Sequence, residues 1–177
     1  MLFTSPGLIH SVAAQSNAAT APAISAATQQ FITNVAISDL FEIASARLAL
    51  ARGTEPQKTF ANQMIADHGK TSSELRKIIV VRSMNVDLPS QLDTAHQAKY
   101  DQLNDARGDD FGALYATQQV AAHKEAIANY DRYAKGGDVP ELRDWAAKTL
   151  PQLSQHLEMA QKLTQQGGAP TTGRSSN

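Results

Sequence analysis

The sequence predicts an all-α protein, a bundle of four long helices with a short extra helix in a long crossover between the second and third. Three observations carry this prediction. Aromatic residues make up only 6% of the 177 residues, while alanine, leucine and glutamine are abundant, a composition that favours helix over sheet. Long stretches lack both glycine and proline. Within these stretches apolar residues recur at steps of three and four, the period of an amphipathic helix.

The predicted bundle domain spans residues 29–166, between a leader and a tail of different composition. Residues 1–28 contain no charged side chain, and MLFTSPGLIHSVAAQ is similar to the end of a secretory signal that lacks its positive beginning. We interpret residues 1–28 as a truncated signal-like leader and flexible linker, with a merely flexible apolar leader as the alternative. Residues 167–177 are predicted to be a disordered tail. A secretory signal would place the protein in the periplasm or outside the cell.

The apolar part of the leader does not predict a membrane anchor. It is interrupted by Ser5, Pro6, Gly7 and His10, and it falls well short of the roughly 20 apolar residues of a membrane-spanning helix.

The first two long helices are predicted over residues 29–52 and 54–84. Gly53 follows the first as a C-terminal residue in the left-handed conformation. Thr54 is expected to cap the second, which has Pro56 in its first turn. The two helices are therefore joined by a very short connection and are expected to be antiparallel neighbours.

The next segment has a different character. NVDLPS interrupts the helical pattern at Pro89, Ser90 can cap a short helix over residues 91–107, and Gly108 is expected to end it. This connection of about 24 residues is far longer than the usual 2 to 8 residues between antiparallel helices. It is long enough to run back along the bundle, which is the ferritin-like topology.

The third and fourth long helices are predicted over residues 110–135 and 140–166. Gly136 and Gly137 end the third, and Asp138 is expected to cap the fourth. Pro151 lies inside the fourth helix, where we expect it to bend the helix before His156.

Polar residues interrupt the apolar stripes at one place on each long helix. His68, His123 and His156 lie in the middle of the stripes of the second, third and fourth helices, and the first helix carries Asp39 and Glu42 on one face. A carboxylate on such a face must find a partner, because an unpaired buried charge costs several kcal/mol.

The depth of these residues along the bundle indicates a shared site. In the crossover topology Glu42 and the three histidines all lie roughly 15 to 20 Å from the same pole. We therefore predict a mononuclear metal site with Glu42, His68, His123 and His156 as ligands. Asp39, about one turn from Glu42, is a candidate second oxygen ligand.

Imidazole ligands favour zinc, iron, manganese or copper over calcium and magnesium. Zinc is the leading prediction for a closed site of four ligands, and the other three ions are alternatives. Asp67, adjacent to His68, is expected to contact a ligand imidazole of a neighbouring helix from outside rather than to bind the ion. The alternative is that the histidines are hydrogen-bonded packing residues and no metal binds.

The charge and the cysteine content exclude some partners and some kinds of chemistry. The net charge of -1 is spread along the chain without a basic stripe, so nucleic acid is not a predicted partner. The chain has no cysteine, which excludes disulfides, thiolate catalysis and CxxC metal sites. An envelope protein or a second copy of the chain remains a candidate partner.

Four stretches around the candidate ligands together resemble the domain-of-unknown-function family 4142, over about residues 29–163: FEIASARLALARG, FANQMIADHGK, YATQQVAAHKEAI and LPQLSQHLEMAQKL. The resemblance implies a ferritin-like four-helix fold and export to the bacterial periplasm or envelope, and it implies no reaction. Di-iron ferritins use Glu-x-x-His on two helices, whereas Ile65 and Leu153 stand at the glutamate positions here. A dinuclear site is therefore not expected.

These observations favour an extracytoplasmic bundle that stores, buffers or senses one transition-metal ion, or uses it in a stress-related redox role. The alternative is a non-catalytic envelope interaction or structural module with packing histidines. A hydrolase with an open coordination position is a third hypothesis. No sequence motif assigns a catalytic residue, so the prediction leaves enzymatic activity open.

Overall fold

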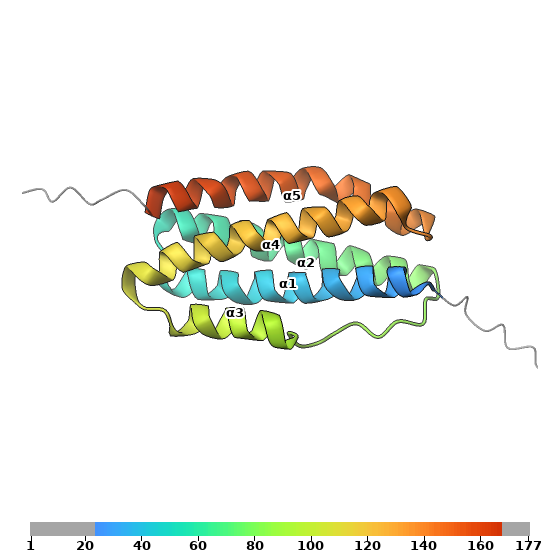
Figure 1. Cartoon of the computed structure of the whole chain (residues 1–177), viewed down its shortest axis with the longest axis horizontal. Helices are drawn as coiled ribbons and strands as arrows, with labels where there is room; N and C mark the ends of the chain where they lie inside the picture. The colour runs from blue at the N-terminus through green and yellow to red at the C-terminus, as the bar shows by residue number, and fades with distance from the viewer. Residues whose placement is uncertain (1–23, 168–177) are drawn as a thin grey trace, which may run out of the picture.

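The computed structural model describes residues 24–167 and confirms the predicted all-α bundle (Figure 1). Its five helices are, in order, α1 (Ala26–Arg52), α2 (Glu55–Val81), α3 (Thr94–Asp105), α4 (Gly108–Gly136) and α5 (Pro140–Gly167). The four long helices run side by side, and α3 lies outside them along α1 (Figure 1). An extended segment after α2 runs back to α3, so the chain follows the predicted long crossover. Residues 1–23 and 168–177, with most of the predicted leader and tail, lie outside the described residues.

Local contacts determine where α1 begins and ends and where α2 begins. α1 begins at Ala26, three residues earlier than predicted, because the Ser25 hydroxyl accepts a hydrogen bond from the Thr28 N–H. Gly53 was expected to be left-handed but is extended, with φ of -76°. Glycine fits there because a Cβ would lie 2.6 Å from the carbonyl oxygen of Ala49. Thr54 caps α2 as predicted, in a capping box with Gln57.

The crossover differs from the prediction in its details. α2 ends at Val81, three residues before the predicted end. Asp93, not Ser90, caps α3, because its carboxylate accepts a hydrogen bond from the His96 N–H at 2.8 Å. α3 ends at Asp105, and Gly108 begins α4 instead of ending α3. Its φ of 54° suits glycine at this sharp junction.

α5 begins at Pro140 as predicted and continues through Pro151 as one helix. The bend expected at Pro151 stays a prediction. Asp138, predicted to cap this helix, uses its carboxylate to accept hydrogen bonds from the hydroxyls of Ser25 and Thr28. Asp138 therefore connects the loop before α5 to the start of α1.

The interior has two apolar clusters, one toward each end of the bundle. The first, the aromatic core, lies where α1 begins and α4 ends. Phe31 stacks on Tyr133 at a centroid distance of 4.0 Å and meets Trp145 edge to face. The second, the alanine-rich core, lies toward the end of α1 and the start of α2. Its buried members are Ala46, Ala49, Phe60, Ala61, Met64, Leu103, Phe111, Tyr115, Ala116, Ala160 and Leu163.

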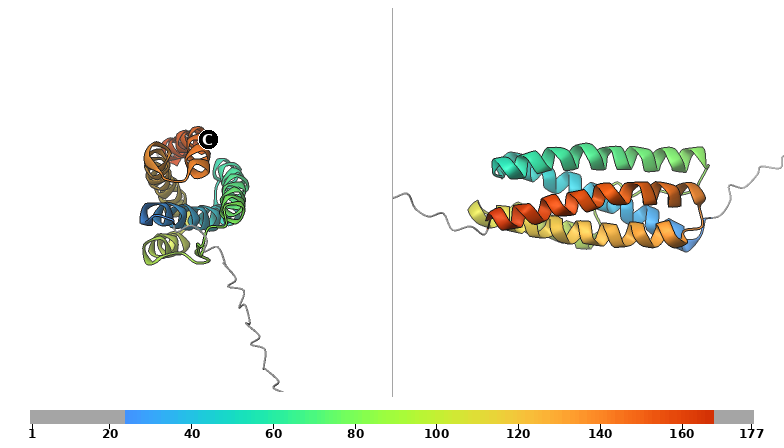
Figure 2. Two further views of the ribbon diagram at one scale, coloured as in Figure 1. Left: turned by 90° about the vertical axis from the view of Figure 1, so that its right-hand side faces the viewer. Right: turned by 90° about the horizontal axis from the view of Figure 1, so that it is seen from above.

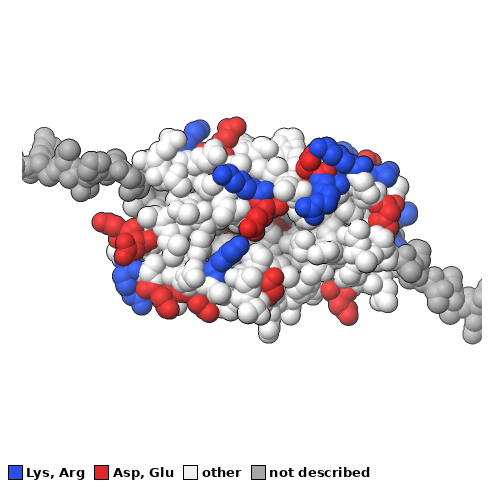
Figure 3. Space-filling model, in the orientation of Figure 1, with Lys and Arg blue, Asp and Glu red and all other residues white. Residues whose placement is uncertain are grey.

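The outer surface carries charges of both signs, intermixed on the face that Figure 3 shows. Among the described helices, none combines the length and the apolar character needed to cross a membrane. Viewed along the axis, the four long helices surround a common interior, with α3 outside (Figure 2). The candidate site lies in this interior, between the two apolar clusters.

Candidate metal centre

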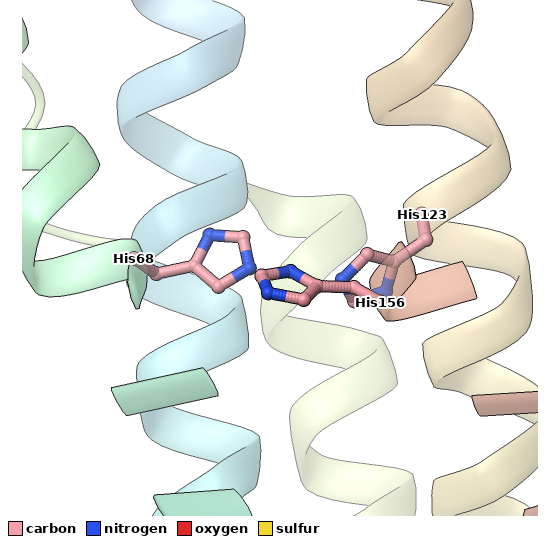
Figure 4. Close-up of side chains that lie close together, drawn as sticks. All are labelled: His68, His123 and His156. Atoms are coloured by element: carbon pink, nitrogen blue, oxygen red, sulfur yellow. The ribbon is translucent and has the colours of Figure 1, made fainter. Parts of the chain in front are cut away.

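Three histidines from three helices meet in the middle of the bundle (Figure 4). The ring centroids of His68, His123 and His156 are 5.4 to 5.7 Å apart in every pair. Each ring offers one nitrogen, and these nitrogens lie within 4.8 Å of one another. All three side chains are buried. The structure thus brings the predicted histidines into one layer, as equal depth on α2, α4 and α5 requires.

Each imidazole is fixed by a hydrogen bond at one of its nitrogens. Nδ1 of His68 lies 2.8 Å from Oδ1 of Asp39, and Nε2 of His156 lies 2.8 Å from Oδ2 of Asp67. Nδ1 of His123 donates to the backbone carbonyl of Gln119, also at 2.8 Å. Because carboxylates and carbonyls accept hydrogen bonds, the held nitrogen of each neutral ring carries the hydrogen. The other nitrogen of each ring then presents its lone pair.

These second nitrogens are buried and unsatisfied by the protein. Nε2 of His68, Nε2 of His123 and Nδ1 of His156 have no hydrogen-bond partner among residues 24–167. A buried polar atom left without a partner costs about 1 to 3 kcal/mol. Three lone pairs on fixed rings in one buried layer form a donor set that a transition-metal ion would complete.

The structure places Asp39 behind His68, and its role as a second oxygen ligand stays a prediction. Its Oδ1 contacts His68, and its Oδ2 accepts a hydrogen bond from the Ser72 hydroxyl at 2.8 Å. Both carboxylate oxygens are therefore engaged outside the triad. In this position Asp39 orients the imidazole and increases its basicity.

Asp67 lies outside the triad and holds His156, a histidine of another helix, by its 2.8 Å contact. Its side chain is 16% exposed, and it also accepts a hydrogen bond from the Gln63 amide. Burial alone would raise the pKa of Asp67, but hydrogen bonds from Gln63, His156 and Gln152 outweigh it and lower the pKa. Asp67 is thus a carboxylate that holds His156 from the surface side of the bundle.

Glu42 lies beside the triad without joining its convergent nitrogens. It is 1% exposed, and its Oε1 is 3.9 Å from Nδ1 of His123. The group of ligand atoms within 4.8 Å of one another contains the three histidines and not Glu42. Neither of its carboxylate oxygens has a hydrogen-bond partner in the described part of the chain. Burial raises the pKa of Glu42 to about 7, against the opposing effects of His68, of the adjacent Gln119 side chain and of His156.

The environment keeps two of the rings neutral. Burial lowers the pKa of His123 and of His156 to about 4 in each case. Burial acts in the same direction on His68, but the hydrogen bond and charge of Asp39 outweigh it and raise its pKa. Because a metal binds the neutral imidazole, His123 and His156 offer their lone pairs at ordinary pH without first losing a proton.

Sequence reasoning missed two supports of the site. Gln119 stands one turn before His123, so its carbonyl reaches Nδ1 of that ring through the regular geometry of α4. Ser72 stands one turn after His68 and faces Asp39 on α1. The spacing of four residues on one helical face was the available signal for both, because such residues are neighbours on a helix.

The fold and the site define a class: a four-helix bundle with a long crossover and a buried cluster of three histidines. The chain belongs to the family described as Domain of unknown function (DUF4142), whose profile matches residues 13–163. The resemblance found in the four sequence stretches is thereby confirmed. No curated protein matches the chain.

A similar fold is found in the solved structure of CopM in the Cu(II)-bound form. The TM-score is 0.66 at 17% sequence identity, and the alignment covers 78% of this chain and 95% of that one. At this identity the likeness concerns the fold alone.

Proposed function

We propose that the protein binds one transition-metal ion through His68, His123 and His156. Two observations carry the proposal. Each ring is held through one nitrogen while the other is buried without a partner within residues 24–167, and one nitrogen of each ring lies within 4.8 Å of one from each of the other two rings. Asp39, Asp67 and the carbonyl of Gln119 orient the three rings from outside. Glu42 supplies a carboxylate next to the ion.

The competing function, a structural module with packing histidines, explains the arrangement less well. A packing histidine satisfies both nitrogens or leaves one in contact with solvent. Here three rings each leave a buried nitrogen unsatisfied within residues 24–167, and Glu42 is buried beside them. Such a cluster lowers the free energy of unfolding. A bound ion would satisfy all three nitrogens and would compensate the charge of Glu42.

Copper and zinc are the first ions to test. Imidazole suits both, and divalent copper generally binds a given nitrogen site more tightly than zinc. The similar structure of CopM holds Cu(II). Copper is therefore as strong a candidate ion as zinc, the leading prediction from the sequence. Iron and manganese are the next candidates.

The proposed role is extracytoplasmic storage, buffering or sensing of that ion, or a stress-related redox function. Export is proposed on the basis of the signal-like leader. A site made of imidazoles from three helices, in a chain with no cysteine, suits an oxidising compartment, where thiolate ligands would be lost to disulfides.

The experiment is metal analysis of protein stripped with EDTA, offered Cu(II) or Zn(II), and passed through a desalting column. We expect about one equivalent of ion per chain in the wild type and none in His68→Ala, His123→Ala or His156→Ala. His96→Ala is the matched control, because His96 is held by Asp93 on α3 and lies outside the triad. The wild-type result would contradict the proposal if neither of these ions nor iron nor manganese binds in stoichiometric amount.

The competing module predicts a different thermal behaviour. Its melting temperature would not respond to EDTA or to added ion. A melting temperature that rises with added Cu(II) or Zn(II) in the wild type and in His96→Ala, and not in His123→Ala, separates the two functions.

A further inference from the structure

The three carboxylates around the histidine layer differ in their access to solvent. Asp39 is 2% exposed and Glu42 is 1% exposed, whereas the side chain of Asp67 is 16% exposed. Both oxygens of Asp39 are also engaged, one with His68 and the other with Ser72. An ion that approaches from outside therefore meets Asp67 before it meets either of the other two carboxylates.

The contacts of Asp67 connect the surface of the bundle to the triad. Its Oδ2 accepts a hydrogen bond at 2.5 Å from the amide of Gln63, an exposed residue one turn earlier on α2. The same oxygen lies 2.8 Å from Nε2 of His156. The second nitrogen of that ring, Nδ1, is buried without a partner within residues 24–167. The ring of His156 thus contacts the partly exposed carboxylate through one nitrogen and belongs to the buried layer through the other.

Asp67 and His156 meet across the interface between α2 and α5. These two helices pack less extensively than α1 with α2, α1 with α4, or α4 with α5. The hydrogen bonds across the interface are polar contacts near the surface, and a second one joins Nε1 of Trp145 to Glu74 at 3.0 Å. Regions with few buried apolar contacts open at a lower free-energy cost than well-packed ones. The α2/α5 interface is therefore a suitable place for the bundle to open.

The side of the bundle formed by α1 and α4 is screened. α3 packs against both of these helices and lies outside the four long ones (Figure 2). At the depth of the triad, the ring of His96 on α3 meets Phe41 of α1 edge to face, at a centroid distance of 5.5 Å. Phe41 is buried and directly precedes Glu42. A whole helix thus separates this side of the triad from solvent, whereas the α2/α5 side presents Asp67.

We propose that Asp67 is a capture site for the metal ion, and that the ion enters the triad between α2 and α5. The inference rests on the proposed function. A partly exposed carboxylate suits a first contact, because its charge attracts a hydrated divalent ion and its oxygens can replace water as ligands. The ion passes inward when the hydrogen bond between Asp67 and His156 breaks and the ring turns aside. Once the ion is inside, that bond forms again and holds the ring.

Association kinetics distinguish a capture site from a carboxylate that only orients a ring. Metal-free wild type, Asp67→Asn and Asp39→Asn are mixed with Cu(II) in a stopped-flow instrument, and binding is followed by the quenching of Trp145, the single tryptophan. Each variant loses one negative charge that supports a histidine, so the two are matched in net charge. We expect Asp67→Asn to slow association by about 10-fold, the lower end of the effect of electrostatic steering. Asp39→Asn should associate at the wild-type rate and release the ion faster.

The outcomes of this experiment separate the inference from the proposed function. Equal association rates in Asp67→Asn and Asp39→Asn would overturn the capture site, while one equivalent of Cu(II) bound at equilibrium would still support the proposed function. A wild type that takes up no Cu(II), and no zinc, iron or manganese, would contradict the proposed function itself and the capture site with it.

A second measurement needs no metal and tests the route. Diethyl pyrocarbonate modifies neutral imidazoles that solvent reaches, and mass spectrometry of peptides follows each histidine separately. His123 and His156 both have a pKa of about 4, so at neutral pH their reaction rates compare access. We expect His156 to react faster than His123 in the metal-free wild type, with the partly exposed ring of His96 as the reference for an accessible histidine. Equal rates, or faster reaction at His123, would overturn the α2/α5 route.

Discussion

The aromatic core and the histidine layer are built from similar helices, but they differ in whether their buried polar atoms are hydrogen-bonded. In the aromatic core the Tyr133 hydroxyl bonds the Thr28 hydroxyl at 2.7 Å, and Nε1 of Trp145 donates to Glu74 at 3.0 Å. These two polar groups are hydrogen-bonded while their rings pack. In the histidine layer, one nitrogen of each of His68, His123 and His156 and both carboxylate oxygens of Glu42 have no such partner in the described residues.

The difference shows that stability and the site are located in different parts of one bundle. Unsatisfied buried atoms reduce the free energy of unfolding, and they persist only where other contacts compensate. Phe31, Tyr133 and Trp145 provide such contacts at one end, and Phe60 with Tyr115 and Phe111 at the other. The histidine layer is held between two well-packed regions.

The largest expected effect tests whether the aromatic core provides stability without taking part in the site. Phe31→Ala removes a buried ring that stacks on Tyr133, and such truncations cost about 3 to 5 kcal/mol. We expect urea denaturation to show this loss while metal stoichiometry measured under native conditions stays at the wild-type value. A loss of stoichiometry in folded Phe31→Ala would mean that the two regions are coupled.

The next effect concerns the carboxylate in the histidine layer and depends on pH. The pKa of Glu42 is raised from 4.5 to about 7, so the folded protein holds this proton more tightly than the unfolded chain. Its contribution to stability is therefore complete below pH 4.5 and is lost as pH rises through 7. This change in pKa corresponds to about 3 kcal/mol in the free energy of unfolding.

Replacing this carboxyl group by an amide removes the titration. In metal-free protein, the stability of Glu42→Gln relative to the wild type should increase by about 3 kcal/mol between pH 4.5 and pH 8, measured by urea denaturation at several pH values. A pH-independent difference would show that Glu42 is not buried as a high-pKa acid. Glu141→Gln, on the exposed first turn of α5, is the control.

Ligand linkage gives the third effect. An ion that binds only the folded protein adds about 2.7 kcal/mol to the free energy of unfolding at 100 times its dissociation constant. We expect this increase in the wild type, followed as a shift in the denaturation midpoint, and none in His156→Ala. An equal shift in His156→Ala would mean that the ion binds elsewhere.

The smallest effect sharpens the role of the carboxylates behind the rings. Asp39→Asn keeps the shape of the side chain but removes the charge that supports His68, and such outer contacts change metal affinity by about 10- to 100-fold. Calorimetric titration should show weaker binding in this range. Asp93→Asn, which alters the equivalent pair with His96 on α3, should leave the affinity unchanged.

Much of the fold followed from local patterns. The four long helices were predicted within a few residues, because the 3.6-residue period and the glycine and proline positions act over one or two turns. The misplaced start of α3 has a similar explanation. Ser90 and Asp93 are both good caps, and the choice of Asp93 depended on which residue could bond the His96 N–H, which spacing alone does not decide.

By itself, the sequence determined that His68, His123 and His156 would share one depth, because helix rise and topology convert residue number into height along the bundle. Only the tertiary structure decided the role of each neighbour: Asp39 behind His68, Glu42 beside the triad, and the Gln119 carbonyl on His123. These roles differ by a few ångströms and by side-chain rotamer. The packing angles between helices, which no single helix encodes, set distances on that scale.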